Sequence, residues 1–199
     1  SASKQVVMGS AGNEVFKVKL QETSNVEDVK VTDLIFTDAI TGGSAGVASF
    51  QSMTLWDGST QIGGPLNMTI GTSATTSTVQ FSFATPVVVS RNSSKVVTLK
   101  GDIADIISLG STSGSSEKFK IYTSTTDVIA LGKDSNASAT VTTSSATSNT
   151  STVAQTKLSL SASLLGSGTN RTRVSVDDIA TLNFAANSAY QLTVNTISL

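Results

Sequence analysis

The chain has 199 residues, with 13 Lys and Arg against 14 Asp and Glu, a formal net charge of -1, and neither His nor Cys. This composition excludes Ser-His-Asp and Cys-His catalysis, zinc sites with nitrogen and sulfur ligands, and a disulfide framework. The near-zero charge also argues against nucleic acid and anionic membranes as partners, because both require clustered Lys and Arg.

Short hydroxyl side chains dominate the polar composition. Ser and Thr number 33 and 29 and fill 62 of 199 positions, whereas charged residues make up 14%, against about 25% in an average domain. Hydrophobic residues reach 38%, which is enough for a packed core. The apolar runs are much shorter than the roughly 20 residues of a membrane-spanning helix. We therefore expect a folded domain with a weakly charged surface and no membrane insertion.

Apolar residues recur with a period of two along most of the chain, which predicts half-buried strands. The pattern begins at Phe16, Val18 and Leu20 and continues through Val29–Phe36, where a change of phase predicts a bulge. It returns at Val79–Phe83 and at Phe119–Ile121. The Phe residues in phase, among them Phe16, Phe36, Phe81 and Phe83, are predicted to lie in the core.

Turn and helix signals separate these runs. Asp57-Gly58, between Thr54–Trp56 and Thr60–Ile62, predicts a two-residue hairpin turn. Helical spacing occurs only at Ile103, Ile106 and Ile107, after Asp102, which is enough for one or two turns.

Two segments have low complexity. Residues 110–116 are predicted to form a loop. The segment 135–152 is nearly all Ser, Thr, Ala and Asn. We expect strands over Ala139–Thr142 and Thr150–Val153 rather than a flexible linker, because Thr and Val favour strands.

These elements predict an all-β fold: an Ig-like antiparallel β-sandwich over residues 1–155, followed by a second, incomplete β unit over 156–199. An internal repeat supports this division. Leu192–Leu199 reproduces the apolar pattern of Val29–Phe36, and Ser161–Ser163 repeats Ser1–Ser3 at an offset of about 160 residues.

Such a partial unit cannot close a core alone, because two or three strands leave an apolar face and two edges uncovered. The missing strands can come from a continuation of the protein, from the first domain, or from a neighbouring copy by strand exchange. The candidate assembly residues are Leu192, Val194, Ile197 and Leu199.

Three segments, Glu27–Thr32, Leu55–Gly63 and Ser94–Ile103, resemble the Ser/Thr-rich β-sandwich repeats of prokaryotic cell-surface proteins, of the S-layer-like or filament kind. This resemblance covers most of residues 1–155. It implies an extracellular structural role at the cell surface and no catalytic residues. Trp56 stands where typical members have a small residue or Tyr.

Several polar patterns are weaker candidates for sites. Two carboxylate pairs, Asp102 with Asp105 and Asp177 with Asp178, lack the spacing of a calcium loop. Ser94-Lys95 lies in an alternating strand, so the two side chains face opposite ways and do not form a dyad. Trp56 is expected to pack in the core rather than to contact a ligand. Five Asn-x-Ser/Thr sequons are candidate glycosylation sites, at Asn92, Asn67, Asn136, Asn149 and Asn170.

The sequence therefore predicts a structural subunit of an extracellular surface assembly, either a filament resembling a pilus or an S-layer-like lattice. It would polymerise with copies of itself through β-strand complementation. We expect no enzymatic activity, no cofactor and no metal, with glycans as a further partner class. The alternative is an adhesin or carbohydrate-binding repeat of a longer surface protein.

Overall fold

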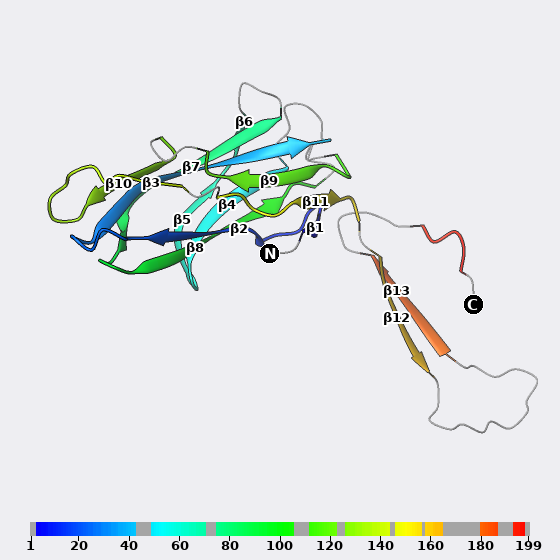
Figure 1. Cartoon of the computed structure of the whole chain (residues 1–199). Coiled ribbons are helices and arrows are strands. Elements are labelled where there is room, and N and C mark those ends of the chain that lie inside the picture. Colours follow the sequence, from blue (N-terminus) through cyan, green and yellow to red (C-terminus); the bar gives the residue numbers. More distant parts are fainter. Residues whose placement is uncertain are drawn as a thin grey trace, which may run out of the picture. The chain divides into compact units, whose positions relative to one another are not determined.

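In the computed structural model, every regular element of the described residues is a β-strand (Figure 1). The residues that the structure describes are 3–42, 49–70, 75–105, 112–122, 126–143, 146–156, 158–164, 180–186 and 193–197. The chain divides into two compact units, Ser1–Gln155 and Thr156–Leu199. The predicted all-β class is confirmed.

Two sheets make up the first unit. Its strands are Lys4–Val7 (β1), Asn13–Gln21 (β2), Val29–Thr41 (β3), Phe50–Asp57 (β4), Thr60–Leu66 (β5), Thr69–Ile70 (β6), Thr76–Val89 (β7), Ser94–Ile103 (β8), Ser116–Lys120 (β9), Val128–Gly132 (β10) and Ser151–Ala154 (β11). The larger sheet has the order β1-β11-β9-β3-β7-β6, with β10 also paired to β3. The smaller sheet has the order β2-β8-β4-β5.

Strand β3 organises the larger sheet. One edge of β3 pairs with β7, and the other edge is shared by β10 and β9. Val31 and Asp33 pair with consecutive residues of β10, so that Thr32 is an extra residue on β3. This is the bulge that the phase change in Val29–Phe36 predicts.

Alternate residues of both sheets pack into one hydrophobic core. Phe36 of β3 is fully buried, and its ring meets those of Phe16 on β2 and Phe81 on β7 edge to face, with centroids 6.0 Å apart in both pairs. Phe50 on β4 and Phe119 on β9 make a third such pair at 5.1 Å. Because the first and third pairs join the two sheets, the arrangement is a sandwich. Edge-to-face pairs add about 0.5–1.5 kcal/mol beyond the burial of their area.

The predicted hairpin joins β4 to β5, with its turn one residue further along than expected. Asp57 pairs with Thr60, which leaves Gly58 and Ser59 as the two turn residues. Gly58 has a φ of 58°, and a glycine at the first central position is typical of a type II′ turn. Asp57 instead extends the ladder and pairs with Lys95 of β8 at 2.7 Å.

Two strand predictions need correction. The sandwich is not wholly antiparallel, because β1 and β11 pair in parallel. The expected strand over Ala139–Thr142 is wrong, although β11 confirms the neighbouring prediction to within one residue. Ser138 makes a single bridge to Leu131, and Ala139 donates one backbone hydrogen bond to Ala130. The small side chains of this segment offer little apolar contact to hold a longer ladder.

The predictions for Ile103 and Trp56 are also wrong. Ile103 is the last residue of β8, and Ile106 and Ile107 lie outside the described residues. Trp56 is half-buried on the outer face of β4, because its neighbour Leu55 points inward and is fully buried. Its indole N–H donates to Thr54 Oγ1 at 2.9 Å, and Lys100 Nζ lies 4.4 Å from its ring centroid.

The second unit contains two described strands, Leu158–Leu164 (β12) and Ala180–Ala186 (β13), which pair antiparallel. In the first unit the opening strands β1 and β2 lie in different sheets. The pairing of β12 with β13 therefore does not reproduce theirs, and the internal repeat stays a prediction.

Candidate functional site

The hairpin of β12 and β13 has one apolar face. Leu158, Leu160 and Ala162 lie opposite Ala186, Phe184 and Leu182, so that these side chains share one side of the ribbon. The other side holds Ser159, Ser161, Ser163, Thr181, Asn183 and Ala185. The two strands contain no charged residue.

This apolar face is uncovered. Leu160 is 59% exposed, Leu158 41% and Phe184 39%, and none of the described side chains of the second unit is buried. Full burial of one such side chain is worth about 1.5–3 kcal/mol. An isolated two-stranded hairpin is at best marginally stable in water. The face therefore has the chemistry of a contact surface.

The predicted assembly residues lie in the same unit. Val194 and Ile197 are 41% and 53% exposed and stand outside any described strand. Leu192 and Leu199 lie outside the described residues. The role of all four in assembly stays a prediction.

A groove opens beside strand β2, which ends the smaller sheet and, among the described strands, pairs with β8 alone. The groove has a volume of about 430 Å³. Its apolar lining includes Val18 and Leu20 of β2, Val31 of β3, Val128 of β10 and Val141 of the segment after β10. A second, more polar hollow of about 290 Å³ lies beside the start of β2, between Glu14–Lys17 and Thr147–Ser151.

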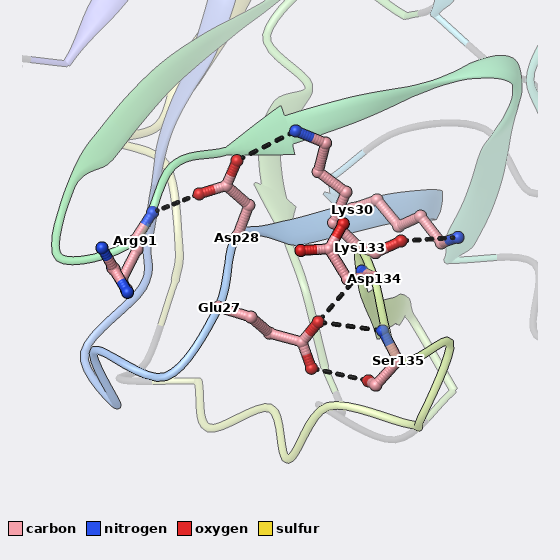
Figure 2. A network of polar contacts seen from close by, with 7 residues as sticks. All are labelled: Glu27, Asp28, Lys30, Arg91, Lys133, Asp134 and Ser135. Carbon is pink, nitrogen blue, oxygen red and sulfur yellow. Dashed lines mark hydrogen bonds and ion pairs between the residues drawn. The ribbon is translucent and has the colours of Figure 1, made fainter.

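A polar network holds one rim of this groove (Figure 2). Glu27 accepts hydrogen bonds from the backbone N–H groups of Asp134 and Ser135, at 3.0 and 3.1 Å, and from the Ser135 hydroxyl at 2.6 Å. Asp28 accepts one from the backbone N–H of Arg91 at 2.9 Å and pairs with Lys133 Nζ at 3.1 Å. The network thus ties the start of β3 to the turns that follow β7 and β10.

Glu22 joins the turn after β2 to the turn between β7 and β8 in the same way. This buried carboxylate accepts hydrogen bonds from the backbone N–H groups of Ser24, Asn25 and Asn92. Hydrogen bonds from Ser24 and Asn92 lower the pKa of Glu22, and those from Ser135 and Asp134 lower the pKa of Glu27. A lowered folded-state pKa stabilises the fold above the ordinary value of 4.5, and this contribution is lost as the pH falls below it.

Replacing Glu27 with Gln should loosen the groove rim. The amide keeps the size of the side chain but loses the charge and one acceptor oxygen, so we expect faster hydrogen exchange at residues 133–139, measured by mass spectrometry. Glu14→Gln is the matched control, because Glu14 makes an exposed ion pair with Lys17. Equal exchange in the two variants would contradict the role given to Glu27.

A pair of acids lies inside the sandwich. Asp38 of β3 and Glu117 of β9 are both fully buried, and Ser77 on β7 lies directly opposite Asp38. Glu117 Oε1 accepts hydrogen bonds from the hydroxyls of Ser49 and Ser115. Both Asp38 oxygens, Glu117 Oε2 and the Ser77 hydroxyl lack a hydrogen-bond partner. The described buried side chains include no Lys or Arg to balance the charge.

Burial raises the pKa of Asp38 well above its ordinary value, and the neighbouring charge of Glu117 raises it further. The fold therefore favours the protonated form of Asp38. Sequence analysis missed both residues, although each stands in the apolar phase of its strand.

The sequons occupy surface positions where they are described. Asn92 lies in the turn between β7 and β8, and Asn67 between β5 and β6; both are exposed. Asn136 accepts a hydrogen bond from Lys30 Nζ, and Asn149 is exposed beside β11. Asn170 lies outside the described residues.

The other polar candidates have structural contacts where the structure describes them. Asp102 accepts a hydrogen bond from the backbone N–H of Gly12 at 2.7 Å, which is a structural role. Asp177 and Asp178 lie outside the described residues. Lys95 makes an ion pair with Asp57 rather than a dyad with Ser94. Among the described residues, His, Cys, Asp and Glu nowhere gather in a group of three or more that could hold a metal ion.

Comparison with family models, curated proteins and solved structures gives no match for this chain. Within the part of the chain that the structure describes, no helix has the length and apolar character needed to cross a membrane. The apolar hairpin face and the groove beside β2 are therefore the two surfaces that bear on function.

Proposed function

We propose that this protein is a structural subunit of an extracellular assembly at the cell surface, a filament or an S-layer-like lattice, which polymerises through β-strand complementation. The observation that supports this proposal is the apolar face of the β12–β13 hairpin, with Leu160 59% exposed. A hairpin with such a face needs further strands to cover it.

A second copy of the chain can supply that cover. If the hairpin of one copy docks on a different surface of the next, the contact is heterologous and does not close on itself, so it propagates a polymer. Strand addition gives such contacts main-chain hydrogen bonds for affinity and alternate side chains for specificity. The absence of charge on β12 and β13 favours this mode, because no ion loses its hydration on docking.

Electron microscopy of the purified chain tests the proposal directly. We expect ordered filaments or sheets from the full chain and dispersed particles from a chain that ends at Gln155, with circular dichroism to check that both are folded. Dispersed particles from both chains would contradict the proposal. That result would favour the adhesin or carbohydrate-binding alternative.

A further inference from the structure

We propose that the groove beside β2 is the acceptor site for the apolar hairpin face of a second copy of this chain. This inference rests on the proposed function and specifies which surface of the neighbouring subunit is used. The free edge of β2 would take the hairpin as additional strands of the smaller sheet, with the hairpin's Leu and Phe side chains directed into the groove.

The groove lies between the two sheets where the smaller one ends. Val31 of β3 and Val128 of β10 belong to the larger sheet, whereas Val18 and Leu20 belong to β2. Across the groove from β2, Ser138 and Thr147 make isolated bridges to Leu131 and Lys120 of the larger sheet and not to β2. Among the described strands only β8 pairs with β2, which leaves the other edge of β2 for an added strand.

The groove and the hairpin match in chemistry. Just over half of the residues that line the groove are aliphatic and most others are polar, and Val26 among them is 72% exposed. The carboxylates of Glu22 and Glu27, also on the rim, already accept hydrogen bonds from backbone N–H groups of this chain. An uncharged strand can therefore enter without leaving either carboxylate unpaired.

The two elements also match in length and in pattern. β12 has 7 residues and β2 has 9, so β12 can pair along most of the β2 edge. Alternate residues of β12 are apolar, which is the spacing needed to direct one set of side chains into a groove. Because the proposed function is an assembly of identical copies, the occupant is the hairpin of a second copy.

Cysteine cross-linking between copies tests this assignment, because the natural chain contains no Cys. Full-length Leu20→Cys and full-length Leu160→Cys are mixed under mild oxidation, and disulfide-linked dimers are counted. The controls place the cysteine on the opposite faces of the same strands, at Lys19 and Ser161. We expect at least about tenfold more of the Leu20–Leu160 product, since a disulfide requires Cβ atoms within about 4.5 Å of each other.

Three results would separate the possible failures. Polymers of the unmodified chain together with no preference for the Leu20–Leu160 product would overturn the acceptor site and leave the proposed function standing. A chain with both cysteines that cross-links only within itself would overturn the second copy as the occupant. The preferred product without any polymer in the microscope would support the acceptor site and count against the proposed function.

Discussion

Replacing Asp38 with Asn should stabilise the protein at neutral pH. The amide is neutral at every pH, and its NH₂ group can donate to Glu117 Oε2, which now lacks a donor. A buried polar group without a partner costs about 1–3 kcal/mol. We expect a gain of roughly that size, which raises the melting temperature by about 5 °C in a chain of this length. Thermal unfolding followed by circular dichroism measures it.

The pH dependence of the same variant gives a second check. The pKa of Asp38 is raised in the folded state, so unfolding releases its proton at any pH between the ordinary Asp value and the folded one. Its stabilising contribution is therefore fully present below the ordinary value and is lost as the pH rises through this range. Asp38→Asn should gain least over the natural chain in acid and most at neutral pH.

Asp33→Asn is the matched control on the same strand. Asp33 accepts a hydrogen bond from the Ser82 hydroxyl at 2.5 Å, and that bond lowers its pKa. Its amide variant should therefore be no more stable than the natural chain at neutral pH. If Asp38→Asn melts below the natural chain at neutral pH, the raised pKa given to Asp38 is contradicted.

The sequence predicts those parts of this fold that depend on local alternation. Phe16 and Val18 on β2, and Val79 and Phe81 on β7, are buried as their phase predicts. The bulge at Thr32 follows from the change of phase between Val31 and Leu34. These predictions succeed because the side-chain period of a strand is fixed by its backbone.

The sequence does not predict features that depend on which strands are neighbours. The groove exists because β2 ends its sheet while residues 137–143 follow the other sheet, and neither fact is visible in local patterns. The segment Ala139–Thr142 has strand propensity but no ladder partner. The residue type of Trp56 favours core packing, whereas the phase set by the buried Leu55 places its side chain on the outer face.

The buried acids show that a sequence signal can be present and still be missed. Asp38 follows Leu34 and Phe36 in the inward phase of β3, and Glu117 stands two residues before Phe119 on β9. A charged residue at a strand position where the alternation predicts an apolar one indicates a special role, because burial of an unpaired charge is costly. What the sequence does not disclose is that the two acids meet across β3 and β9.

Removal of the apolar hairpin face should have the largest effect on assembly. In the double variant Leu160→Ser/Phe184→Ser, the two side chains that face each other across β12 and β13 become small and polar. Each is worth about 1.5–3 kcal/mol when fully buried, and every 1.4 kcal/mol is a tenfold change in affinity. The concentration at which polymers form should therefore rise by about 10² to 10⁴, as measured by sedimentation.

The control changes Ser161 and Asn183, the next cross-strand pair along the hairpin, which lies on its polar side. The variant Ser161→Ala/Asn183→Ser changes the same two strands but leaves the apolar face intact, so its polymerisation should resemble that of the natural chain. The first unit should melt at the same temperature in both variants, because its core contains none of these residues. Equal loss of polymers in both variants would mean that assembly needs the hairpin's folding rather than its apolar face.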